Sequence, residues 1–175
     1  IIRHMNAELL VLRLLHVLGS IVWVGSSFFT SFFLVPSLKP GSSAFGEVMD
    51  GLGRRKLFTV LPLAALVTIV SGARLLQIAS SGFSGAYFEL ASGRVYALSG
   101  VTAVLAFVLS LLVSRPAAVR AGELAAQRHS ATTDKERAAI DATLALLRRR
   151  GQRATTVAMA LLIVSACGMA VARYL

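Results

Sequence analysis

Residues 14–38 read LLHVLGSIVWVGSSFFTSFFLVPSL, and His16 is the only ionisable side chain in this run of 25 residues. Three further runs carry no charged residue, at 57–73, 95–114 and 154–172. A helix of about 20 apolar residues crosses the hydrocarbon core of a bilayer and satisfies its own backbone hydrogen bonds there. The four runs therefore predict an all-α integral membrane protein, a bundle of four transmembrane helices.

The overall composition is typical of a membrane protein. Of the 175 residues, 56% are hydrophobic and 15% charged, and Lys and Arg outnumber Asp and Glu by 18 to eight. On a soluble protein this basic excess would indicate a nucleic-acid partner. Here 13 of the 18 basic residues lie in two segments between spans, 39–56 and 115–153. Cytoplasmic loops of membrane proteins are rich in Lys and Arg, so we attribute the charge to topology and expect no nucleic-acid partner.

The chain is expected to form a single domain over residues 5–175. Its spans are predicted at about residues 8–36, 57–79, 94–115 and 153–175. The positive-inside rule places both basic segments in the cytoplasm and both termini outside. The pair His4-Met5 is what a common cloning site encodes, so residues 1–4 are interpreted as a cloning remnant.

The segment between spans three and four is expected to be helical. Residues 133–136 read TDKE, which fits a capping box, and the Ala- and Leu-rich stretch that follows favours helix. Gly151 then either ends this helix or kinks it into span four. We expect spans three and four to extend into the cytoplasm as a helical hairpin whose basic face touches lipid headgroups.

The first span gathers its polar and small side chains on one side. At 100° per residue, one stripe contains Arg13, His16, Gly19, Ser20, Trp23, Ser27 and Thr30. The opposite side is apolar and suits lipid. Ionisable groups at membrane depth are costly and are therefore functional candidates, so we expect His16 to point into the bundle.

Four arginines are expected at a similar outer level, one on each span: Arg13, Arg74, Arg94 and Arg173. The acidic residues near this level are Glu8 and Glu89, so the arginines favour a bound anion. Haem suits such a site, because imidazole ligates iron and guanidinium groups pair with propionates. Met169 lies one turn from Arg173 and is a second candidate axial ligand. Spacing alone leaves two alternatives open: His16 as a hydrogen bond between helices, and arginines that snorkel to the headgroups.

The sequence around His16 resembles the first span of the HemJ-type protoporphyrinogen oxidases. The resemblance is carried by Arg13-Leu-Leu-His16, Trp23-Val-Gly25 and Phe33-Leu-Val-Pro36. The family's next segment is matched by Phe45-Gly-Glu-Val-Met49, Arg55, Leu57, Pro62 and Ser71-Gly72. The similarity covers about the first 100 residues, and the related CopD-like four-helix membrane proteins share the His and Trp of the first helix.

Two features depart from the oxidases. Arg94 stands where the family has a lysine, and the ending Met169-Ala-Val-Ala-Arg173-Tyr174-Leu175 resembles an uncharacterised sister group of the same superfamily. The resemblance therefore implies a four-helix fold and a haem-ligand role for His16 more strongly than it implies porphyrinogen oxidation.

These observations predict a bacterial inner-membrane protein that binds haem b. His16 is the expected ligand, Trp23 is expected to pack below the porphyrin, and the four arginines are expected to hold the propionates or an anionic substrate. The resemblance implies electron transfer linked to a porphyrin or a quinone, and hence an oxidoreductase, without naming catalytic residues.

Two other functions stay open. A CopD-like copper protein would use the sulfur atoms of Met159, Cys167 and Met169, which all lie on the fourth span. A non-catalytic membrane scaffold would dock a partner on its cytoplasmic hairpin. Small residues allow close helix contacts within the chain or in a homo-oligomer: Gly19, Gly25, Ser71 and Gly72.

Overall fold

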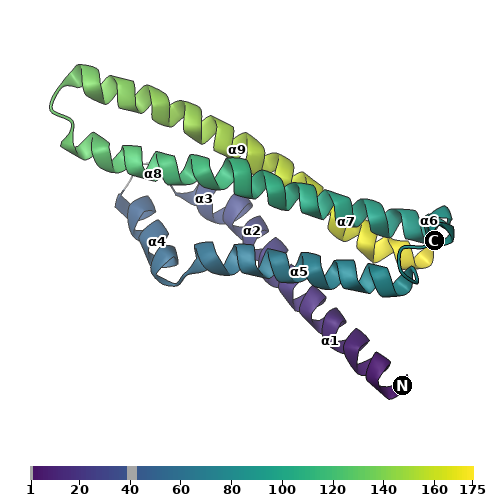
Figure 1. The fold of residues 1–175 in the computed structure, drawn as a ribbon. Helices are drawn as coiled ribbons and strands as arrows, with labels where there is room; N and C mark the ends of the chain where they lie inside the picture. Colours follow the sequence, from purple (N-terminus) through teal and green to yellow (C-terminus); the bar gives the residue numbers. More distant parts are fainter. Residues whose placement is uncertain (1, 39–42) are drawn as a thin grey trace.

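The computed structural model describes the backbone at residues 2–38 and 43–175, and the side chains there except those of residues 2–6, 43 and 129. The described residues are helical almost throughout and contain no strand, which confirms the all-α fold class (Figure 1). Four helical stretches are long and apolar enough to cross a membrane: Ala7–Ser37, Leu57–Ala79, Ala91–Arg128 and Asp134–Tyr174. Ile1 and Lys39 lie outside the described residues, and the interpretation of residues 1–4 as a cloning remnant stays a prediction.

The first spanning stretch is one rod of alternating α and π turns. It consists of α1 (Ile2–Ser20), η1 (Ile21–Gly25), α2 (Ser26–Phe29), η2 (Thr30–Leu34) and α3 (Val35–Ser37). A π turn closes its hydrogen bond one residue later than an α turn and so shifts the direction of the side chains that follow. The rod crosses α5 (Leu57–Ala79) diagonally, and its N-terminal part diverges from the other helices (Figure 1).

A short helix, α4 (Ser43–Arg54), precedes α5. The turn between them places Lys56 in the left-handed region at φ 56°. After α5 comes α6 (Gly85–Glu89), a single turn that packs against the start of α7. The basic residues Arg54, Arg55 and Lys56 thus lie at one end of the second span, and α6 lies at the other.

The second half of the chain is a long antiparallel hairpin. One arm is continuous through α7 (Ala91–Leu109), η3 (Ser110–Ser114) and α8 (Arg115–Ser130), and the other arm is α9 (Asp134–Val171) with η4 (Ala172–Tyr174) at its end. Thr133 is the N-cap of α9, where its Oγ1 accepts from the Glu136 backbone N–H at 3.2 Å. The expected helical extension between spans three and four is therefore confirmed (Figure 1).

Gly151 neither ends nor interrupts α9, which runs unbroken through it. A Cβ atom at Gly151 would lie 3.4 Å from the Ala117 Cβ of α8, an ordinary van der Waals contact, so the two arms lie side by side at this level. Ser165 also links the arms, because its Oγ donates to the Ser99 backbone oxygen at 2.8 Å within the buried interface of α7 and α9.

The core lies where the first rod, α5, α7 and α9 come together. Its buried residues are Trp23, Ala65, Ala103, Ala106, Ala158, Met159 and Leu162. Alanine predominates, so the helices pack at short range through small side chains, as is common in membranes. Gly19 adds to this packing, since a Cβ there would lie 2.5 Å from Thr68 Oγ1 on α5.

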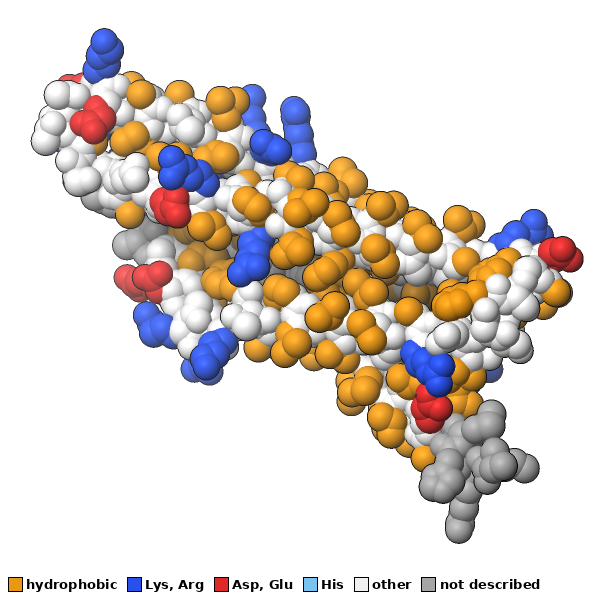
Figure 2. Space-filling view, viewed as in Figure 1, with side chains coloured by type: hydrophobic (Ala, Val, Ile, Leu, Met, Phe, Trp, Pro, Cys, Tyr) orange, Lys and Arg blue, Asp and Glu red, His pale blue; other side chains and the backbone are white. Residues whose placement is uncertain are grey.

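The outer surface of the spans is apolar. Hydrophobic side chains cover the middle of the visible face, and charged side chains lie mainly toward its two ends (Figure 2). Both termini lie at one end of the molecule, whereas α4 and the turn between α8 and α9 lie at the other (Figure 1). A lipid-facing belt between two polar ends is what a multi-pass membrane protein requires.

Candidate functional site

His16 is held between α1 and α5 in a half-buried position. Its Nδ1 atom lies 2.8 Å from the backbone oxygen of Thr68. A carbonyl oxygen carries no hydrogen, so Nδ1 must be the protonated nitrogen and must donate this bond. In the neutral imidazole the lone pair is then on Nε2, which is the nitrogen left to accept a hydrogen bond or to ligate a metal.

The close approach of the imidazole depends on Gly72. A Cβ atom at this position would lie 2.7 Å from His16 Cε1 and 2.9 Å from Nδ1, both too close for a real contact. Because residue 72 is glycine, the imidazole can reach the Thr68 oxygen on this side of α5. Gly19, one turn after His16, similarly brings α1 against Thr68.

The polar stripe of the first span faces the protein, as predicted. Trp23 is 5% exposed, and the other stripe residues from position 16 onward are half-buried. The opposite side is open, with Leu18 58% exposed and Ile21 63% exposed. Arg13 is the exception in the stripe, because it is exposed, whereas Leu9, Leu12 and His16 of the same helix are half-buried.

The four arginines differ in their surroundings. Arg74 joins α5 to α1, with Nε and Nη2 donating to Glu8 Oε1 at 2.9 and 2.7 Å. Its Nη1 donates to Gln77 Oε1 at 2.9 Å. The guanidinium group of Arg173 lies 5.0 Å from the ring centroid of Tyr174. The side chains of Arg13 and Arg94 are exposed and make no hydrogen bond or ion pair with any described residue.

The remaining candidates lie on different helices. Trp23 packs edge-to-face on Phe107 of α7, with ring centroids 6.1 Å apart, and is buried in the core cluster described above. Met169 is half-buried on α9, which packs against α7 and α8, whereas α1 packs against α5. Of the sulfur atoms expected for copper, Met159 is buried in the core and Cys167 is exposed. No group of three His, Cys, Asp or Glu side chains that could hold a metal ion occurs within the described part of the chain.

Thr68 is a site residue that the sequence analysis did not identify. Its backbone oxygen accepts the hydrogen bond from His16. Its Oγ1 atom donates to the Ala64 oxygen at 2.8 Å and is the atom that lies against Gly19. A backbone acceptor leaves no mark in residue type, so composition and spacing do not reveal it. The spacing of Thr68 and Gly72 by one helical turn is the available signal.

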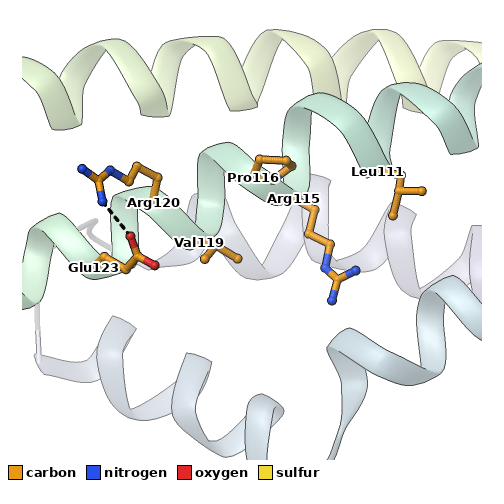
Figure 3. A pocket seen from close by; sticks show the side chains of 6 residues that line it. All are labelled: Leu111, Arg115, Pro116, Val119, Arg120 and Glu123. Carbon is orange, nitrogen blue, oxygen red and sulfur yellow. Dashed lines mark hydrogen bonds and ion pairs between the residues drawn. The ribbon is translucent and has the colours of Figure 1, made fainter.

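Two surface hollows lie around the first turn of α8, at the end of spans three and four that is farther from the termini. The larger, of about 470 Å³, is lined by Leu111, Arg115, Pro116, Val119, Arg120 and Glu123 (Figure 3). The smaller, of about 220 Å³, lies between this turn and α9 and includes Arg120 and Arg150. His16 and the four arginines expected near it line neither hollow.

The structure defines the chain as an all-α, multi-pass membrane protein with a helical hairpin extension. Searches of protein-family models, curated proteins and solved structures give no match to it. The resemblance to HemJ-type and CopD-like proteins therefore stays a prediction from the residues quoted above.

Proposed function

We propose that this chain is a membrane haem b-binding protein in which His16 is an axial ligand. The observation that supports this most directly is the 2.8 Å bond from His16 Nδ1 to the Thr68 backbone oxygen. Histidines that ligate metals almost always donate their other ring N–H to a backbone oxygen or a carboxylate, which fixes the tautomer and the ring orientation. His16 meets this requirement through a main-chain atom of a neighbouring helix.

A single histidine fits haem better than it fits a bare metal ion. A protein zinc site takes three or four ligands from side chains, whereas the porphyrin supplies four nitrogens to iron and leaves one or two axial positions. The described residues provide one inward imidazole and no cluster of three His, Cys, Asp or Glu side chains. This donor set matches an axial ligand.

Arg74 is the arginine best suited to a haem propionate. It already directs two N–H groups at one carboxylate, that of Glu8, at 2.9 and 2.7 Å. It lies on α5, two residues after Gly72, and α5 is the helix whose Thr68 oxygen accepts the hydrogen bond from His16. Arg13, Arg94 and Arg173 are further proposed anion contacts at the same end of the molecule, and Met169 is the proposed second ligand.

When bound, haem b would supply one-electron redox chemistry, and the proposed class is an oxidoreductase of HemJ-like type that acts on a porphyrinogen or a quinone. The chain's own contribution is to fix the imidazole, exclude water with an apolar helix surface and neutralise anionic groups at one end. We propose a bacterial inner membrane as its location, with the termini outside and the basic ends of the spans in the cytoplasm.

The test is the absorption spectrum of the full chain purified in detergent from haem-replete cells. A Soret band is expected, with substoichiometric or no haem in His16→Ala. His16→Gln is the sharper variant, because a glutamine amide can still donate to the Thr68 oxygen but cannot ligate iron. If His16 only links the helices, His16→Gln keeps every property of the parent. His129→Ala, in α8, is the matched control and is expected to keep the band.

A colourless parent protein under these conditions would contradict the proposal. Metal analysis of that preparation would then separate a copper protein from a scaffold. A Soret band that survives unchanged in both His16 variants would equally reject His16 as the ligand.

A further inference from the structure

The smaller hollow, beside the first turn of α8, lies at the level where the third span changes from apolar to basic. Its wall on one arm is formed by Leu112 and Val113, the last apolar residues before Arg115. Leu112 is 65% exposed, so this wall faces the lipid. Arg120 of α8 and Arg150 of α9 lie on the polar side of the same hollow.

The charge within this hollow is positive. Arg120 and Arg150 line it and no acidic residue does. Arg120 also donates from Nη1 to Glu123 Oε2 at 2.9 Å, but Glu123 lies in the neighbouring, larger hollow (Figure 3). Arg150 has no ion pair with any residue that the structure describes. A group with negative charge would therefore find one guanidinium fully available and a second shared with Glu123.

We propose that this hollow binds the phosphodiester headgroup of an anionic phospholipid. Two arginines on facing helices match a phosphate, since guanidinium groups donate to phosphate oxygens in pairs. The apolar wall of Leu112 and Val113 continues from the phosphate level into the membrane and suits the first part of an acyl chain. A soluble anion would use the arginines but not this wall. Basic pockets between transmembrane helices at the cytoplasmic side are known to take such headgroups.

This inference is independent of haem binding, because the hollow lies beside the first turn of α8, away from the termini and from the level of Arg74. It requires only that the chain spans the membrane with the α8–α9 extension at the headgroup level. It also distinguishes a specific site from the general attraction of a basic hairpin to an anionic surface.

The experiment is native mass spectrometry of the full chain in detergent, titrated with phosphatidylglycerol or with phosphatidylcholine of the same acyl chains. A phosphatidylglycerol adduct is expected at concentrations where phosphatidylcholine gives none. Arg150→Gln is expected to weaken this adduct about fivefold or more, the effect of one basic residue near an anionic lipid. Arg120→Gln is the second variant and is expected to act in the same direction.

Arg149→Gln is the matched control, because it removes the same charge from the same helix but does not line the hollow. It is expected to change the apparent Kd less than twofold. Equal losses in Arg149→Gln and Arg150→Gln would overturn the proposal in favour of diffuse attraction. Equal binding of the two lipids would overturn it in favour of unspecific lipid contact. Displacement of the lipid by millimolar inorganic phosphate would show that the site takes a soluble anion instead.

Discussion

The imidazole of His16 donates from Nδ1 to the backbone oxygen of Thr68 at 2.8 Å and so joins the first two spans. The bond is made to a carbonyl in the middle of α5, and it is accessible because Gly72, four residues later, has no side chain to cover it. This one contact thus orients the imidazole, fixes its tautomer and links α1 to α5.

Gly72→Ala is expected to displace this imidazole without removing it. The new Cβ would lie 2.7 Å from His16 Cε1, so the ring must move away from Thr68. Overpacking of this kind costs about 1–3 kcal/mol of stability. Loss of a hydrogen bond that orients a metal ligand typically costs about 10–100-fold in affinity, and haem occupancy is expected to fall accordingly. Haem content and the thermal transition of the detergent-purified protein are the measurements.

Gly100→Ala serves as the control for Gly72→Ala. Gly100 also lies inside a spanning helix, α7, but a Cβ there meets nothing within 4 Å. It is expected to keep parental haem content and stability. Should Gly72→Ala behave like Gly100→Ala, the imidazole would not depend on the close approach to α5.

Arg74→Gln is expected to speed the release of haem to an apo-globin acceptor, whereas Glu8→Gln is expected to leave it unchanged or slow it. The two residues form an ion pair whose side chains are 46% and 43% exposed, so breaking it costs folding about 1 kcal/mol or less. Glu8→Gln frees the guanidinium for a propionate, and Arg74→Gln removes it. Equal release rates in parent and Arg74→Gln would assign Arg74 to the helix pair alone.

The fold class could be predicted because charge-free runs of about 20 residues have one stable solution in a bilayer. Residues 57–79 were expected as a span, and α5 occupies Leu57–Ala79. The third and fourth spans were expected at 94–115 and 153–175 with a helical extension between them, and their helices do continue as α8 and the first half of α9. Polar sequence marks where a span leaves the lipid, and it does not mark where the helix ends, which depends on caps such as Thr133.

The candidate site could be predicted in part. Helical periodicity places His16 and Trp23 toward the protein, and both lie there. The same periodicity placed Arg13 inward, but Arg13 is exposed and Leu12 beside it is half-buried. The exact side of α1 that meets α5 depends on how the two helices cross, which is a tertiary property that residue spacing does not contain. The π turns η1 and η2 were not anticipated, because they depend on one extra residue per turn and have no distinctive composition.

The orientation across the membrane is testable with single cysteines in a Cys167→Ser background. Ser130→Cys lies at the tip of the hairpin, and Tyr174→Cys lies near the C-terminus, where Tyr174 is 77% exposed. An impermeant maleimide is expected to label Tyr174→Cys in intact spheroplasts and Ser130→Cys only after lysis, since basic segments are retained in the cytoplasm. The reverse pattern would place the termini inside.

Asp141→Asn is expected to loosen the tip of the hairpin while leaving the spans intact. Asp141 of α9 receives two bonds from Arg128 of α8, from Nε at 2.6 Å and from Nη2 at 3.0 Å. This paired contact joins the two arms near their turn, far from the buried core, so its loss should increase local opening and not global unfolding. Hydrogen exchange is expected to accelerate in α8 and the first turns of α9 and to stay unchanged in α5 and α7.

Glu123→Gln is the control, because its bond to Arg120 lies within one helix and does not connect the arms. Unchanged exchange at the tip in Asp141→Asn would mean that apolar contacts such as buried Leu144 and Leu124 hold the arms together without the ion pair.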